Sequence, residues 1–384
     1  MTPFNFQTVP QIVVEAGGAR RLGEIMSRRF KPGRLCVITD GPLYRSGLLD
    51  EALRSLKDSG WQTHVVSDVQ ADPPEQVVEA ICAQAREHAT EVVLGFGGGS
   101  SMDVAKLVAI VLGSDQPLSK MYGVDQVQGE RVPLVLVPTT AGTGSEVTPI
   151  SIVTTGETTK SGIVARQLYA DMAVLDAELT IGLPSHITAA TGIDAMVHAI
   201  EAYTSKRLKN PLSDNLAVQA LRLLMANLVK VCEDGKDLAA REGMLLGSML
   251  AGQAFANAPV AAVHALAYPL GGRFHLPHGL TNALVLLPVL EFNLSAALPV
   301  YAQLAREVLP GVQGDDEAQA QALLARFKQL IEGTRLPVRL RDHGVGESDL
   351  PTLAADAMLQ TRLLVNNPRE VSEAEALALY RQAY

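Results

Sequence analysis

Two segments in the second half of the chain carry side chains that could hold a divalent metal ion. The first, TAATGIDAMVHAIEAYT at 188–204, has a helical composition and places Asp194 and His198 one turn apart on one helix face. The second, VHALAYPLGGRFHLPHG at 263–279, is interrupted by proline and glycine, so a later histidine can turn back toward an earlier one. Carboxylate and imidazole groups are ligands of divalent transition metals. Spacing leaves open which histidines of the second segment would join Asp194 and His198: His264, His275 or His278.

The same residues also have a purely structural interpretation. An aspartate and a histidine four residues apart are common on helices, and a histidine among apolar residues is usually a hydrogen-bonded core group. Spacing alone therefore supports a metal site and a packed core about equally.

A glycine-rich turn in the first half could bind phosphate. The sequence GGGS at 97–100 follows an apolar, β-rich run at 91–96, and a helix is expected from about Ser101. Glycines let the backbone approach a pyrophosphate, and the helix N-terminus supplies unpaired N–H groups. The motif is not the GxGxxG fingerprint, so an ordinary strand–helix turn is the alternative. On the following helix, Asp103 and Lys106 are spaced to form an ion pair.

Other polar side chains follow predicted strands. Asp40 closes a strand at 34–39 and precedes a glycine, where a carboxylate could accept hydrogen bonds from ribose hydroxyls and repel a 2′-phosphate, or could simply form an Asp-Gly turn. After a strand at 132–137 comes a hydroxyl-rich loop, which is either a satisfied turn or a ligand cradle. Its hydroxyl side chains are Thr139, Thr140, Thr143 and Ser145.

The elements that must position these residues change in type along the chain. Strand-like and helix-like segments alternate in the first half, with a further strand at 62–67 and a helix at 74–89, which predicts a Rossmann-like α/β domain with a parallel sheet. From Leu183-Pro184 onward the chain is rich in alanine and leucine at helical spacing, for example at 214–231, 239–255 and 316–333. We therefore expect an α/β domain over 1–182 and an all-helical domain over 183–384.

Composition excludes several classes of function. The 384 residues are 47% hydrophobic and 19% charged with a net charge of −9, and no basic run is present, which argues against nucleic acid and anionic membranes as partners. The first residues lack the pattern of a signal peptide, and no uninterrupted apolar run reaches the roughly 18–20 residues that span a bilayer. Three scattered cysteines suit a reducing compartment, so a cytoplasmic protein is expected.

Four motifs in order resemble the iron-containing (group III) alcohol dehydrogenase family, which includes lactaldehyde reductase and 1,3-propanediol dehydrogenase. They are GFGGGSSMDVAK at 95–106, PTTAGTGSEVT at 138–148, TGIDAMVHAIEAY at 191–203 and HALAYPLGGRFHLPHGLTNA at 264–283. The resemblance implies the two-domain architecture shared with dehydroquinate synthase. It also implies four metal ligands, Asp194, His198, His264 and His278, and leaves His275 as a bystander. Many relatives carry a histidine four residues after the third ligand, whereas this chain has Tyr268, which could relay a proton, contact the cofactor or pack.

The resemblance further implies the cofactors and partners. The metal would be Fe²⁺, with Zn²⁺ possible because it binds an Asp/His₃ site more tightly. The dinucleotide would be NAD, and hydride would pass between it and a small alcohol or aldehyde, with the metal acting on the substrate oxygen. The residues implied to contact NAD are Asp40, Gly97, Gly98, Gly99, Ser100, Thr139, Thr140, Thr148, Lys160, Leu179 and Leu183. The family also implies a homodimer or larger homo-oligomer, with a possible edge strand at 4–16.

Other functions remain open at this level. A dehydroquinate synthase-like lyase shares the two-domain plan, NAD and the metal, but it needs a set of basic residues for a phosphorylated substrate that this chain lacks. A hydroxyacid–oxoacid transhydrogenase would keep its cofactor bound while substrates exchange. Maleylacetate reductases generally lack the complete ligand set, and that set also argues against a non-catalytic binding protein.

Overall fold

The computed structural model describes residues 3–114, 116–156 and 159–384, which form two compact units. The α/β unit contains residues 8–140 and 144–182. The helical unit contains the N-terminal segment that ends at Gln7, residues 141–143, and residues 183–384. Their folds, an α/β half and a helical half, confirm the predicted fold class.

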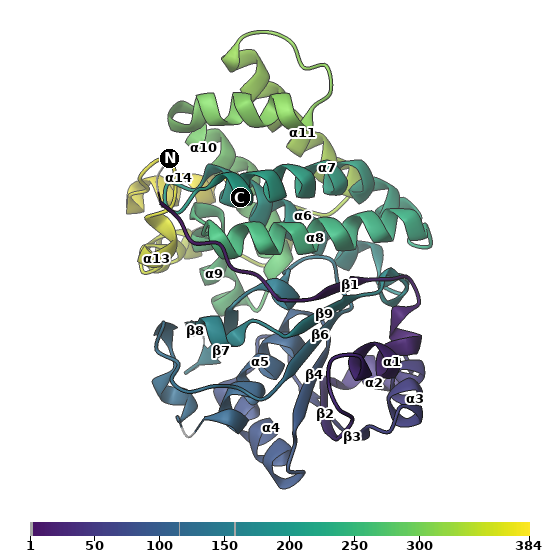
Figure 1. The fold of residues 1–384 in the computed structure, drawn as a ribbon. Helices are drawn as coiled ribbons and strands as arrows, with labels where there is room; N and C mark the ends of the chain where they lie inside the picture. Colours follow the sequence, from purple (N-terminus) through teal and green to yellow (C-terminus); the bar gives the residue numbers. More distant parts are fainter. Residues whose placement is uncertain (1–2, 115, 157–158) are drawn as a thin grey trace. The chain divides into compact units, whose positions relative to one another are not determined.

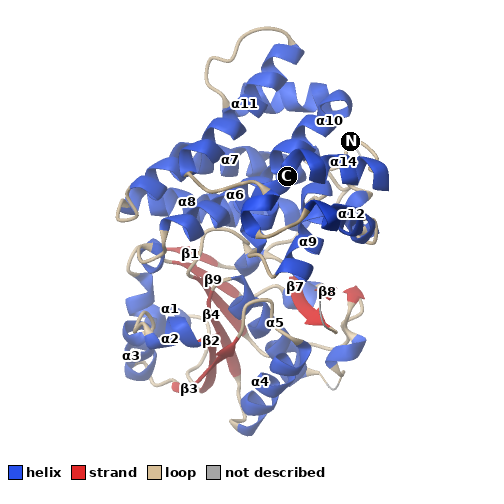
Figure 2. Cartoon of the chain, turned by 180° about the vertical axis from the view of Figure 1, so that it is seen from behind, coloured by secondary structure: helices blue, strands red, loops and turns tan. Residues whose placement is uncertain are grey.

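A parallel sheet organises the α/β unit, and its strands run side by side in Figure 2. Its order is β1-β9-β6-β4-β2-β3, and the paired strands are parallel throughout. The strands are β1 (Ile12–Val14), β2 (Arg34–Asp40), β3 (Gln62–Val69), β4 (Val92–Gly97), β6 (Leu134–Pro138) and β9 (Met172–Leu175). Four of them lie where the sequence predicted strands, because strands buried on both faces read as continuous apolar runs.

Helices cover this sheet. One side of the core joins alternate strand residues, such as Leu94 and Phe96, to Leu22 and Leu56 from nearby helices. Those helices are α1 (Leu22–Ser27), α2 (Gly41–Arg45) and α3 (Asp50–Asp58), while α4 (Glu75–Glu87) and α5 (Gly99–Gly113) complete the set. Residues 102–111 of α5 are all buried, so this helix is apolar all round rather than amphipathic.

A small second sheet also belongs to the α/β unit. Strands β5 (Gly123–Val124), β8 (Thr159–Val164) and β7 (Ile150–Thr155) lie in that order, and β7 and β8 are antiparallel. The sequence interpretation placed Lys160 in a turn, which was wrong. Lys160 lies on β8, paired with Thr154 of β7, because the β-branched run on both sides of the turn favours a hairpin.

The helical unit contains nine α-helices within the described residues (Figure 1). They are α6 (Ser185–Thr204), α7 (Pro211–Glu233), α8 (Leu238–Asn257), α9 (Ala262–Phe274), α10 (His278–Val308), α11 (Asp316–Thr334), α12 (Leu350–Ala357), α13 (Thr361–Leu364) and α14 (Glu373–Ala383). Sequence patterns predicted α7, α8 and α11 to within a few residues. Capping side chains mark their starts: Asn210, Asp237 and Asp315 each accept a hydrogen bond from the first turn.

Two of these helices, α7 and α10, are long and apolar enough on average to cross a membrane, with hydropathies of 1.2 and 1.8. In the most apolar stretch of each, 44% and 50% of the residues are buried inside the structure. Helix α10 packs against α6, α9 and α11. A core helix has this combination of composition and burial.

Candidate metal centre

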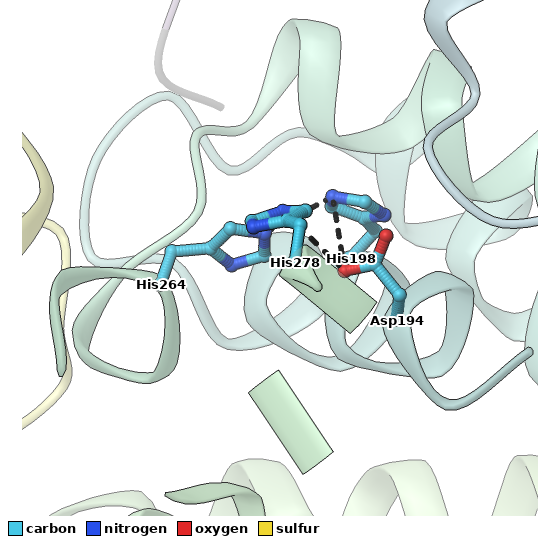
Figure 3. Close-up of side chains that lie close together, drawn as sticks. All are labelled: Asp194, His198, His264 and His278. Carbon is cyan, nitrogen blue, oxygen red and sulfur yellow. Dashed lines mark hydrogen bonds and ion pairs between the residues drawn. The ribbon is translucent and has the colours of Figure 1, made fainter. Parts of the chain in front are cut away.

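Four side chains from three helices converge in the helical unit (Figure 3). Asp194 and His198 come from α6, His264 from the first turn of α9, and His278 from the first residue of α10. One ligand atom from each lies within 4.8 Å of the others. Nε2 of His264 is 3.0 Å from Nε2 of His198, and Oδ1 of Asp194 is 3.6 Å from Nε2 of His278. This is the four-residue set that the family resemblance implied.

The break between α9 and α10 creates this convergence. Helix α9 ends at Phe274, and His275 follows in a left-handed conformation with φ 53°. Pro277 then precedes the first residue of α10. His275 is exposed and is not a member of the cluster found among the described residues.

Burial and mutual charge set the protonation of the cluster. Asp194, His198 and His264 are 1–4% exposed, whereas the side chain of His278 is 30% exposed. Burial alone would raise the pKa of Asp194, but the neighbouring His198, His278 and His264 and a hydrogen bond from Asn282 lower it overall. Burial lowers the pKa of His198, and burial together with the other two histidines holds the pKa of His264 well below its ordinary value.

This donor set fits a divalent transition metal. Metal ligands must be deprotonated, and these shifts favour an ionised Asp194 beside neutral imidazoles with lone pairs to offer. Three nitrogen ligands and one oxygen ligand suit iron or zinc.

Asn282 is a member of the site that the sequence analysis missed. Its Nδ2 atom donates to Oδ1 of Asp194 over 2.5 Å and lies 3.3 Å and 3.4 Å from Nε2 of His264 and His278. It is fully buried, and its Oδ1 atom has no hydrogen-bond partner among the described residues. Its position four residues after His278, on the same face of α10, was the available signal.

Glu201 and Phe255 were missed as well. Glu201, three residues after His198 on α6, accepts hydrogen bonds from Nδ1 of His264 and from two main-chain N–H groups. Burial raises the pKa of Glu201 to about 7, against the opposing effect of those N–H groups. The ring of Phe255 stacks on His198 with centroids 4.3 Å apart.

Tyr268 lies beside the cluster. It follows His264 by one turn of α9, and its half-buried ring lies 6.5 Å from the ring of His264 and 6.0 Å from that of His278, centroid to centroid. An aromatic side chain therefore borders the cluster at the position where many relatives have histidine.

The residues predicted to bind a dinucleotide gather partly at the carboxyl ends of adjacent strands. Strand β4 ends at Gly97, Gly98 is the N-cap of α5, and Gly99 begins the helix. Thr139 donates its main-chain N–H to the carbonyl of Gly97 over 3.0 Å, and Thr140 lies next to Gly98. Neighbouring parallel strands thus bring the glycine turn and the threonines together, at the edge where α/β folds bind ligands.

Asp40 lies at the end of β2, the strand next to β4. Its carboxylate accepts a hydrogen bond from Leu43 N–H over 2.9 Å and caps α2. The turn-forming role considered from the sequence is therefore present, and Oδ2 of the same carboxylate is not used by that bond.

Other predicted cofactor contacts have structural partners. The hydroxyl of Thr148 lies 3.2 Å from Nζ of the fully buried Lys106, which forms the predicted ion pair with Asp103 at 3.4 Å. Lys160 forms an ion pair with Asp72 at 2.5 Å. Leu179 packs in the core of the α/β unit, and the carbonyl of Leu183, in the helical unit, accepts a hydrogen bond from Arg241.

Comparisons with known proteins agree over nearly the whole chain. Residues 10–177 match the family described as iron-containing alcohol dehydrogenase, and residues 188–384 match its C-terminal part. Long-chain-alcohol dehydrogenase 1 of Geobacillus thermodenitrificans is 39% identical over 361 residues, which cover 93% of this chain and 91% of the relative.

Two solved structures extend this likeness to the fold. A crystal structure of a 1,3-propanediol oxidoreductase matches with a TM-score of 0.95 and 34% identity over 100% of both chains. A sulfoacetaldehyde reductase from Bifidobacterium kashiwanohense, solved with NAD⁺, matches with a TM-score of 0.89 and 27% identity over 100% of this chain and 99% of that one. From its two halves and its relatives alike, the chain belongs to the iron-containing alcohol dehydrogenase family and is a metal-dependent alcohol oxidoreductase.

Proposed function

We propose that this protein is an NAD-linked dehydrogenase of small alcohols and aldehydes whose iron is held by Asp194, His198, His264 and His278. The observation that carries the proposal is the convergence of one carboxylate and three imidazoles within 4.8 Å, three of them buried. A structural cluster of this kind has no evident benefit for stability, because burying titratable groups costs free energy unless a ligand compensates.

The chemistry follows from these groups. A divalent cation held here supplies Lewis-acid assistance to an alcohol or carbonyl oxygen. The chain's own contribution is to keep the imidazoles neutral by burial and to keep Asp194 ionised through its neighbours. Tyr268, next to His264 and His278, is positioned to bind or relay a proton at the substrate oxygen.

The α/β unit supports NAD as the hydride carrier. The free N–H groups at the start of α5 and the glycines at 97–99 suit a pyrophosphate, and Asp40 suits a ribose with a free 2′-hydroxyl. The relative from Bifidobacterium kashiwanohense was solved with NAD⁺. We extend the binding surface to Ser100, Thr139, Thr140, Thr148, Lys160, Leu179 and Leu183.

The first experiment tests the metal and the reaction together. The purified protein is stripped with chelator, Fe²⁺, Zn²⁺, Mn²⁺ or no metal is added back, and NADH absorbance is followed with short alcohols and aldehydes. We expect Fe²⁺ to restore activity to the wild type, while His264→Ala loses both bound metal and activity. Full activity in stripped protein would contradict the proposal.

A second experiment tests the cofactor. Asp40→Asn keeps a side-chain oxygen that can cap α2 but removes the negative charge. We expect its KM for NADP⁺ to fall about tenfold, a change of about 1.4 kcal/mol, because repulsion of a 2′-phosphate is relieved. An unchanged ratio of NAD⁺ to NADP⁺ use would place the ribose elsewhere.

A further inference from the structure

Glu201 is a buried carboxylate on the same helix face as two of the proposed metal ligands. On α6, Asp194, His198 and Glu201 stand at positions i, i+4 and i+7, so their side chains leave one side of the helix. Glu201 is only 4% exposed. A carboxylate this deeply buried is stable only where hydrogen bonds compensate its lost hydration, so its partners reveal its role.

Two of those partners belong to the first residues of α9. Oε2 of Glu201 accepts from the main-chain N–H of Ala261 over 2.9 Å, and Oε1 accepts from that of Val263 over 2.7 Å. The N-cap residue Ala261 offers no side-chain cap of its own. Glu201 therefore caps α9 from another helix, with its charge at the positive end of the α9 dipole.

The third partner is the metal-binding candidate itself. Nδ1 of His264 lies 2.7 Å from Oε2 of Glu201. Because both carboxylate oxygens already accept main-chain hydrogen bonds, the ionised form is favoured and Nδ1 carries the proton of this contact. A neutral imidazole has only one N–H, so Nε2 of His264 keeps its lone pair, and that atom lies 3.0 Å from Nε2 of His198.

We propose that Glu201 is a positioning residue of the metal centre, which holds His264 as the Nδ1–H tautomer with its Nε2 lone pair directed at the cation. The proposal rests on the proposed function, because it assumes that the four-residue cluster binds metal. Histidine ligands commonly donate their second N–H to a carboxylate, which fixes the ring and makes the ligand nitrogen more basic. Here one carboxylate does this and also fixes the start of the helix that carries the ligand.

The test compares Glu201→Gln with the wild type. Glutamine keeps one oxygen for a main-chain N–H, but its amide donates where the wild type accepts, so the His264 proton should move to Nε2. In apoprotein labelled with ¹⁵N at its eight histidines, ring nitrogen shifts report the tautomer, and the His264 signals are those missing from His264→Asn. Zinc affinity, measured by competition with a chelating dye, should fall about 10–100-fold.

The matched control is Glu146→Gln, the same substitution at a carboxylate 2% exposed in the α/β unit, which should leave zinc affinity unchanged. A wild-type His264 protonated at Nε2, or unchanged zinc affinity in Glu201→Gln, would overturn the role of Glu201. A wild-type protein that binds no metal would instead overturn the proposed function. The wild-type spectrum needs no variant, so it tests the tautomer even where Glu201→Gln does not fold.

Discussion

The side-chain amide of Asn282 donates to Oδ1 of Asp194 over 2.5 Å, joining α10 to α6 inside the metal-binding cluster. Both residues are fully or almost fully buried, so this hydrogen bond forms in a low-dielectric environment where it orients the carboxylate strongly. The contact links two helices 88 residues apart in the chain.

Removing this amide should weaken metal binding. We expect Asn282→Ala to lower affinity for Fe²⁺ or Zn²⁺ about 10–100-fold, because Asp194 loses the group that fixes its orientation. Chelator competition measures the affinity. Asn293→Ala is the matched control, since Asn293 is also a buried asparagine of α10 but pairs with Asn367. If the two variants lost affinity equally, a general effect on the helix would be responsible.

His275 should prove dispensable for the metal. It is an exposed residue in a left-handed conformation, which costs a residue other than glycine about 1 kcal/mol. We expect His275→Gly to bind a full equivalent of metal and to gain free energy of unfolding of about that size. Metal analysis and denaturant titration check both. Loss of metal in this variant, with metal retained in His278→Ala, would reverse the assignment.

The glycine turn allows ligand approach to be separated from folding. A Cβ atom at Gly98 would lie 3.7 Å from Thr140, an ordinary contact, and the backbone of Gly98 has a negative φ. We therefore expect Gly98→Ala to fold with nearly wild-type stability but to bind NAD⁺ at least about tenfold more weakly, because the methyl group occupies space needed by the pyrophosphate. Calorimetric titration with NAD⁺ measures this.

Gly97→Ala is the contrasting variant. Gly97 has φ 153°, and a Cβ atom there would lie 2.7 Å from Oγ of Ser101, so this substitution should destabilise the unit itself. Unchanged NAD⁺ affinity in Gly98→Ala would show that the phosphates do not approach this turn.

Glu146 should make stability depend on pH. Burial raises the pKa of Glu146 from 4.5 to about 7. Below pH 4.5 the carboxyl is protonated in both the folded and the unfolded state. Above that pH the unfolded chain releases its proton first, so this group's contribution to stability is lost as pH rises to about 7.

Glu146→Gln cannot ionise, so its stability relative to the wild type should increase between pH 4.5 and 7, by an amount on the order of 2–3 kcal/mol. Denaturant unfolding of both proteins across this range gives the difference directly. A difference that stayed constant with pH would show that Glu146 titrates normally in the folded state.

The sequence by itself determined the features that depend on near neighbours. Apolar runs and helical spacing identified four strands of the large sheet and the main helices, because these patterns reflect local backbone geometry and burial. The spacing of Asp194 and His198 placed them on one helix face, and the glycines after β4 marked the turn into α5, for the same reason.

Only the tertiary structure decided which distant side chains meet. The left-handed turn at His275 brings His278, rather than His275, into the cluster. The contact of Glu201 with His264 spans 63 residues, and Lys160 pairs with Asp72 across 88 residues. Such pairings depend on how helices and strands pack against one another, and packing is a property of the whole chain that no local spacing encodes.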